Sequence, residues 1–138
     1  MTEQEILDLR EQIKLYLNHA HRALEAARLT LDHDFYDAAI NRAYYAIFYA
    51  ATALLLTRNI TRAKHSGVVS AFREQFVKTG LIETEYSDLY GTVMESRINS
   101  DYEVTLMADS ATAEKALDAA ERFLQRAGSY LREQEGVT

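Results

Sequence analysis

The sequence predicts an all-α protein, folded as a single domain that is an antiparallel up-and-down bundle of about five helices. Two observations support this prediction. The 138 residues include no proline and five glycines, so few residues interrupt long helices. Apolar residues also recur every three or four positions along most of the chain, which is the spacing that puts them on one helix face. A chain of this length can bury one core, which we expect at about residues 10–132.

The N-terminal half predicts two long helices joined by a short turn. Thr2 and Glu5 have the spacing of a capping box. The apolar positions that follow extend the first helix to about Asp32, and the second helix is expected over residues 35–57. From Ala43 onward this second helix is apolar on nearly every side, which is typical of a helix at the centre of a bundle.

The C-terminal half predicts three further helices. Ser66 is the expected cap of the third helix, and Gly80 is expected to end it because glycine readily adopts the left-handed conformation. The fourth helix is expected over residues 83–99, followed by a loop over residues 101–109. Ser110 is the expected cap of the fifth helix. These short connections between long helices favour antiparallel neighbours.

Composition and motifs exclude several classes of function. The chain has no cysteine, so it has no disulfide, thiolate metal site or cysteine nucleophile. The four histidines lack the Glu-x-x-His spacing of di-iron bundles, and no Gly-rich phosphate loop or H-E-x-x-H motif occurs. We therefore expect no metal and no cofactor. The chain shows no signal-peptide pattern and no apolar run long enough for a membrane span, so we expect a cytoplasmic protein.

The charges are unevenly distributed along the chain. The net charge of −6 by itself argues against a nucleic-acid-binding protein. No acidic residue occurs between Asp37 and Glu74, however, although five basic residues do. They are Arg42, Arg58, Arg62, Lys64 and Arg73. A buried helix explains part of this pattern but not the basic loop that follows it, so the stretch also predicts a surface for RNA, a nucleotide or an acidic partner.

Arg97 is the most unusual charged residue of the predicted helices. It continues the apolar stripe of the fourth helix after Val93 and Met94, so its guanidinium is directed at the packed side. A buried guanidinium needs an anion, because it remains charged in any environment. Asp101 and Tyr102 are one candidate source of that partner, in a purely structural role. The alternative sources of the anion are a bound phosphate and a partner subunit.

Tyrosine and histidine supply the remaining candidates. Tyr44, Tyr45 and Tyr49 cluster on the most buried helix, where they either fill the core or stack on bases. His65 follows Lys64 at the start of the third helix. It is either a surface or capping residue or, because its pKa is near neutral, the histidine best suited to proton transfer.

Three blocks of the sequence together resemble the HEPN family in order and spacing. They are NRAYYAIFYAATALLL at residues 41–56, KHSGVVSAFREQFVKTGLI at 64–82 and SRINSDYE at 96–103. The likeness covers about residues 10–130. It implies an α-helical bundle that forms a homodimer. Short stand-alone members of the family are often encoded beside a minimal nucleotidyltransferase, in pairs that look like toxin and antitoxin.

The resemblance also implies where chemistry would occur. HEPN ribonucleases carry an Arg, four arbitrary residues and a His, and two copies of this motif face each other across the dimer. Here Arg97 matches the Arg, but Tyr102 occupies the His position, and tyrosine is a poor general base near neutral pH. The form R-x-x-x-D-Y looks habitual in this branch of the family. His65 could supply the missing imidazole if the fold brings it near Arg97.

These observations leave three functions open. The favoured one is a HEPN protein that binds a nucleotide or RNA phosphate, pairs with a nucleotidyltransferase, or does both. The second is an active metal-independent ribonuclease, and the third is a non-catalytic adaptor for another protein. Tyr102 is also a candidate target of nucleotide transfer by the partner. The candidate catalytic residues are Arg97, Asp101, Tyr102 and His65. The candidate nucleotide- or RNA-binding residues are Arg42, Tyr45, Arg58, Arg62 and Lys64. We expect neither DNA nor a membrane as a partner.

Overall fold

Five α-helices form the computed structural model of this chain, which describes residues 1–102, 108–134 and 136. A short π-helical segment continues the third helix. In chain order the elements are α1 (Glu3–Asp32), α2 (Tyr36–Leu56), α3 (His65–Phe72), η1 (Arg73–Val77), α4 (Thr84–Tyr102) and α5 (Ser110–Gln134). The described ranges contain no strand. The prediction of an all-α bundle of about five helices is confirmed.

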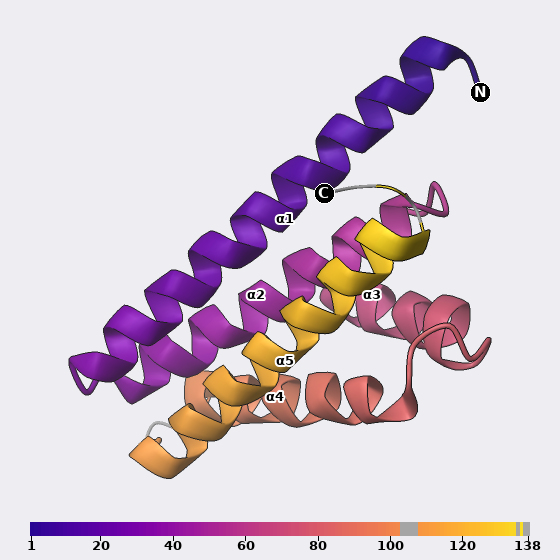
Figure 1. The fold of residues 1–138 in the computed structure, drawn as a ribbon. Helices are drawn as coiled ribbons and strands as arrows, with labels where there is room; N and C mark the ends of the chain where they lie inside the picture. Colours follow the sequence, from indigo (N-terminus) through magenta and orange to yellow (C-terminus); the bar gives the residue numbers. More distant parts are fainter. Residues whose placement is uncertain (103–107, 135, 137–138) are drawn as a thin grey trace.

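Helix α2 lies at the centre of the bundle and contacts α1, α3, α4 and α5. Its burial follows from its sequence, because small and branched apolar residues occur on all of its sides. The fully buried ones include Ala39, Ile40, Ala43, Ala46, Ile47, Ala50 and Leu54. Helix α1 runs beside α2, and its N-terminal part projects beyond the bundle (Figure 1). None of the helices in the described ranges is long and apolar enough to cross a membrane.

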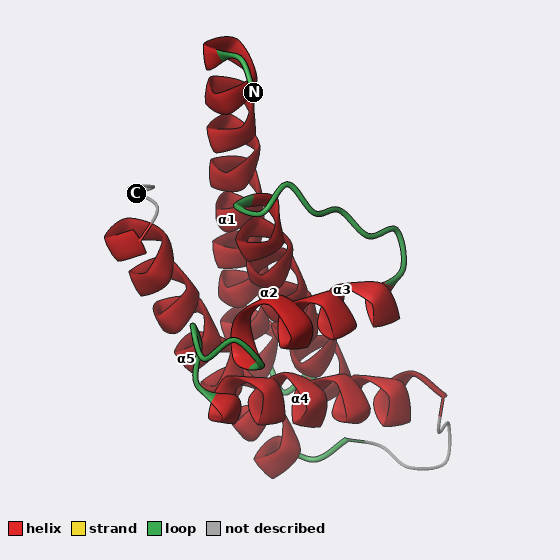
Figure 2. Ribbon diagram, turned by 90° about the vertical axis from the view of Figure 1, so that its right-hand side faces the viewer, coloured by secondary structure: helices red, strands yellow, loops and turns green. Residues whose placement is uncertain are grey.

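Helices α3 and α4 run across the direction of α1 and α2 rather than along it (Figure 2). A long loop leads from the end of α2 back to the start of α3. As a result, α3 begins beside the middle of α2, where the rings of His65 and Phe48 are 4.4 Å apart. Helices α3 and α4 therefore both bring side chains to one face of the central helix α2.

The helix ends agree only in part with the expectations from the sequence. Thr2 caps α1 as predicted, since its Oγ1 accepts a hydrogen bond of 3.1 Å from the backbone N–H of Glu5. Ser66 does not cap α3, because Lys64 occupies the N-cap position and no side-chain cap bond forms there. At α5 the cap is Asp109, whose Oδ1 accepts a 2.8 Å bond from the N–H of Thr112.

Gly80 lies in the turn that follows η1, where the sequence predicted that it would end the third helix. Gly80 has a φ of +80°, in the left-handed region that disfavours residues with a Cβ. Its N–H donates to the carbonyl of Val77, and the N–H of Ile82 reaches back to the carbonyl of Phe76 over 2.9 Å. Ile82 is buried by this turn. The glycine therefore directs the chain from η1 into α4.

Helix α4 is longer at its C-terminal end than the sequence predicted. The fourth helix was expected to end near residue 99, but α4 continues to Tyr102. Asp101 is therefore helical and lies one turn after Arg97 rather than in a loop. The loop expected over residues 101–109 therefore does not include Asp101 and Tyr102, and residues 103–107 lie outside the described ranges.

Tyr90 of α4 combines complete burial with an unpaired hydroxyl group. It is 0% exposed, and its Oη has no hydrogen-bond partner among the described residues. Burial raises the pKa of this phenol far above its usual value, so the hydroxyl stays protonated. A buried polar group without a partner destabilises a fold by about 1–3 kcal/mol.

Tyr90→Phe is expected to increase the free energy of unfolding by about 1–3 kcal/mol, because it removes that hydroxyl and keeps the ring. Urea denaturation followed by circular dichroism measures the change. A decrease in stability would contradict the prediction, since it would mean that the hydroxyl makes a stabilising bond to a buried water.

Candidate functional site

Arg97 of α4 lies over two tyrosine rings of α2. Its guanidinium carbon is 4.9 Å from the centre of the Tyr44 ring and 5.8 Å from that of Tyr45. The electron-rich faces of such rings attract a cation. Arg97 Nε also donates to Asp101 Oδ2 over 3.1 Å, and 19% of the Arg97 side chain is exposed. The guanidinium is thus held between two aromatic rings and one carboxylate, with part of it open to solvent.

His65 reaches the same two tyrosines from the start of α3. The centre of its imidazole is 5.6 Å from the ring centres of both Tyr44 and Tyr45. Burial lowers the pKa of His65, and the positive charge of Arg97 lowers it further. The imidazole is therefore neutral near pH 7 and able to accept a proton. The fold brings His65 and Arg97 to one place, although 31 residues separate them in the sequence. We call Arg97, Asp101, His65, Tyr44 and Tyr45 the Arg97 site.

Tyr44 forms the buried floor of the Arg97 site. It is 0% exposed, and burial raises the pKa of its hydroxyl to about 12, while the charge of Arg97 offsets part of that effect. A phenol with such a pKa stays protonated near neutral pH and cannot act as a base there. Tyr44 therefore supports the side chains of Arg97 and His65 and does not serve as the general base of the site.

Arg42 of α2 adds a second cation beside the Arg97 site. Its guanidinium carbon is 4.9 Å from the centre of the Tyr45 ring. Its Nε and Nη2 donate to the side-chain oxygen of Asn41, over 3.2 and 3.0 Å. No carboxylate pairs with Arg42 among the described residues. Tyr45 is thus in contact with the guanidinium groups of both Arg42 and Arg97. Of these two, Arg97 has an acidic partner in the described ranges and Arg42 does not.

The other predicted binding residues lie elsewhere or contribute less. Arg58 donates to the Tyr130 hydroxyl over 3.2 Å, and its guanidinium carbon lies 5.8 Å from the centre of the Phe76 ring, so it links the turn after α2 to α5 and η1. Arg62 is exposed, and Lys64 is exposed beside His65. Tyr102 ends α4, and its side chain lies outside the described part of the chain.

Sequence reasoning missed two contributions to the site. Phe48 has the shortest ring contact to His65, at 4.4 Å, and its position one helical turn after Tyr44 could have indicated this. Asp37 Oδ1 accepts a 2.6 Å hydrogen bond from the Ser100 hydroxyl. This bond ties the end of α4 to the start of α2 and so positions Arg97. No sequence pattern indicated it.

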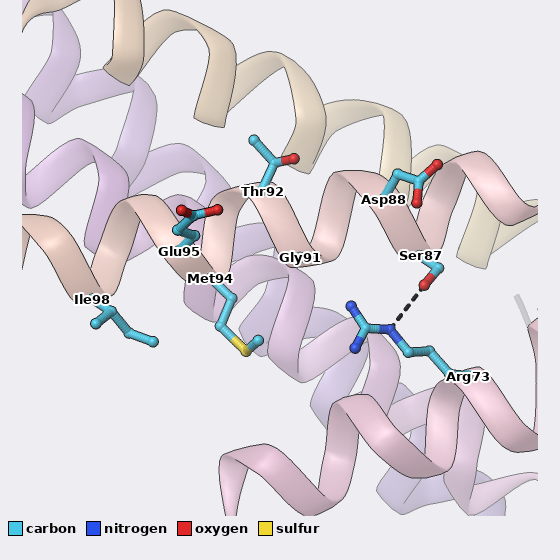
Figure 3. A pocket seen from close by; sticks show the side chains of 8 residues that line it. All are labelled: Arg73, Ser87, Asp88, Gly91, Thr92, Met94, Glu95 and Ile98. Carbon is cyan, nitrogen blue, oxygen red and sulfur yellow. Dashed lines mark hydrogen bonds between the residues drawn. The ribbon is translucent and has the colours of Figure 1, made fainter.

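A separate hollow of about 490 Å³ lies between η1 and α4 (Figure 3). Arg73 Nε donates across it to Ser87 Oγ over 2.8 Å. The carboxylates of Asp88 and Glu95 also line this hollow, so it is less suited to a phosphate than the Arg97 site is. Within the described ranges, no group of three or more His, Asp or Glu side chains could hold a metal ion.

The fold and the site define a helical-bundle protein in which a guanidinium and an imidazole meet on an aromatic floor. Residues 13–130 match the HEPN domain family. Because this match covers most of the chain, the protein belongs to the HEPN family. The resemblance expected from the sequence is therefore confirmed.

Several relatives are similar to nearly the whole chain. "Putative toxin MJ0142" of Methanocaldococcus jannaschii is 34% identical over 128 residues, which cover 91% of this chain and 87% of the relative. "Putative toxin MJ0605" of the same organism is 36% identical over 129 residues, covering 91% and 93%. A "UPF0332 protein" of Thermotoga maritima is 36% identical over 112 residues, covering 81% and 85%.

Proposed function

We propose that this chain is a toxin-like HEPN protein whose Arg97 site binds a phosphate of RNA. The observation that carries the proposal is the convergence of Arg97, Arg42 and His65 on Tyr44 and Tyr45. The toxin names of two relatives support the biological role.

The electrostatics of the site favour an anionic ligand. Asp101 offsets one of the two guanidinium charges, and Arg42 contributes a second charge without a carboxylate partner in the described ranges. A guanidinium offers planar N–H donors that match phosphate oxygens. The positive potential is local, because the whole chain has a net charge of −6.

Arg97→Ala is expected to weaken RNA binding by roughly 10- to 100-fold, because a hydrogen bond to a charged group contributes about 1.5–3 kcal/mol. Fluorescence anisotropy of a labelled single-stranded 2′-O-methyl RNA measures the dissociation constant. The methyl groups remove the 2′-hydroxyls, so the probe stays intact even if the protein cleaves RNA.

Arg122→Ala is the matched control for this experiment. Arg122 pairs with Glu85 on the exposed surface, so its loss removes one positive charge away from the Arg97 site. Circular dichroism verifies that both variants retain their helices. If Arg97→Ala binds RNA as tightly as the unaltered protein, phosphate binding at this site is refuted and the adaptor function takes its place.

A second candidate function, metal-independent RNA cleavage, is favoured by the position and pKa of His65. A neutral imidazole beside a guanidinium can take the proton of an RNA 2′-hydroxyl. The resulting oxygen attacks the adjacent phosphorus, and the bond to the 5′-oxygen of the next nucleotide breaks as that oxygen takes a proton from water. The products are a 2′,3′-cyclic phosphate and a 5′-hydroxyl, with Arg97 stabilising the charged phosphorane.

The proposed partners are a second copy of the chain and a minimal nucleotidyltransferase. Apolar side chains exposed on α1 and the turn after it, such as Leu29 at 61% and Phe35 at 64%, support an interface. Sedimentation that showed only monomer at micromolar concentration would exclude the homodimer. A mass increase on Tyr102 after incubation with such a transferase and ATP would support nucleotide transfer to this residue.

A further inference from the structure

We infer that the Arg97 site binds two consecutive phosphates of an RNA strand, one at Arg97 and the next at Arg42, without reading the base between them. This inference rests on the proposed function and specifies its ligand. It distinguishes an oligonucleotide backbone from a ligand with a single phosphate.

The geometry places the two guanidinium groups around one ring. The guanidinium carbons of Arg42 and Arg97 are 4.9 and 5.8 Å from the centre of the Tyr45 ring. They come from different helices, α2 and α4, and both approach the ring of Tyr45. Two cations held on one patch of surface match the repeated charge of a nucleic-acid backbone.

The two arginines carry one positive charge more than the carboxylate beside them offsets, among the described residues. Asp101 accompanies Arg97, whereas Arg42 contacts only the neutral amide of Asn41 among the described residues. Arg42 is half-buried, so solvent screens its charge incompletely. Asp101 accepts from one N–H of Arg97 and leaves its other donors available, and a phosphate bound by Arg97 alone would leave Arg42 with only the Asn41 amide.

Tyr45 is a positioning residue rather than a platform for a base. Its ring lies 5.3 Å from Tyr44, 6.0 Å from Phe48, 5.9 Å from Tyr49 and 5.6 Å from His65, measured between ring centres. Together with the two guanidinium groups, these neighbours leave little of the ring for stacking. Recognition through phosphates alone carries no sequence information.

Isothermal titration calorimetry with short 2′-O-methyl RNAs tests the inference. A dinucleotide without terminal phosphates has one phosphodiester, and a trinucleotide has two. At low salt the trinucleotide is expected to bind about tenfold more tightly than the dinucleotide. Arg42→Ala is expected to abolish this difference, because it removes the second phosphate contact. Uridine and adenosine trinucleotides are expected to bind equally well.

The salt dependence of binding gives a second readout. With a longer single-stranded 2′-O-methyl RNA, Arg42→Ala should reduce the slope of log affinity against log salt by about 0.7, as expected for one lost phosphate contact. Arg28→Ala is the control, because Arg28 pairs with Glu25 and Glu121 on the α1 and α5 surface. An equal loss in that variant would overturn the inference, since affinity would then follow total charge.

The remaining outcomes separate the inference from the proposed function. Binding that requires Arg97 but is equally strong for the dinucleotide and the trinucleotide overturns the inference alone. A strong preference for one base also overturns it. No RNA binding by the unaltered protein, or binding indifferent to Arg97, refutes the proposed function and the inference with it.

Discussion

Replacing His65 with alanine is expected to lower the rate of metal-independent RNA cleavage by about 10²- to 10⁴-fold, the usual contribution of a general base. The reason is that His65 is the imidazole the fold brings beside Arg97. Incubation of labelled single-stranded RNA with the protein in EDTA, followed by gel electrophoresis, measures the rate. His33→Ala is the control, because His33 is exposed at the end of α1.

The pH profile distinguishes a base from a merely structural histidine. A general base acts in its deprotonated form, so the rate should rise with pH and level off above the pKa of His65. Because burial and the charge of Arg97 lower that pKa from its usual value near 6.5, the midpoint of the rise should lie below pH 6.5. Cleavage that persists in His65→Ala with the same profile would rule out this role. Absence of cleavage above that of Arg97→Ala would rule out the ribonuclease function itself.

Replacing Phe72 with alanine is expected to reduce the free energy of unfolding by about 3–5 kcal/mol, the usual cost of truncating a buried aromatic ring. Phe72 ends α3 and is 0% exposed. Its ring centre lies 5.2 Å from that of Phe123 in α5 and 5.9 Å from that of Tyr90 in α4. Urea denaturation followed by circular dichroism measures the loss.

Phe35→Ala is the control for that measurement. Phe35 is 64% exposed in the single chain, so at a protein concentration low enough to keep the chain monomeric its truncation should change the free energy of unfolding by less than about 0.5 kcal/mol. An equally small effect of Phe72→Ala would contradict the packing described above. Because Phe72 anchors α3, its loss should also displace His65 and weaken any activity that depends on the imidazole.

The sequence by itself determined the helical class and much of the candidate site. The spacing of apolar residues predicted five helices, because that spacing depends only on the 3.6-residue turn. The same spacing placed Arg97 on a packed helix face. The absence of acidic residues between Asp37 and Glu74 made Arg42 one of five basic residues of a predicted anion-binding surface. Three sequence blocks indicated the HEPN family, which the match over residues 13–130 confirms.

The sequence was less informative about helix ends. It predicted Ser66 and Ser110 as caps, whereas Lys64 and Asp109 occupy those positions. It also ended the fourth helix near residue 99, before Asp101. Adjacent polar residues compete for a cap, and tertiary contacts such as the bond from Ser100 to Asp37 extend a helix beyond its local preference.

Only the tertiary structure decided which candidates act together. It joined His65 of α3, Arg97 of α4 and Arg42 of α2 around Tyr45, and it moved Arg58 to a contact with Tyr130 and Phe76. Arg42, Arg58, His65 and Arg97 were all candidates in the sequence, which did not show which of them meet. The physical reason is that periodicity reveals which side of a helix is buried, but the neighbour that covers it depends on how the helices cross. Here α3 and α4 cross α2, and that crossing creates the site.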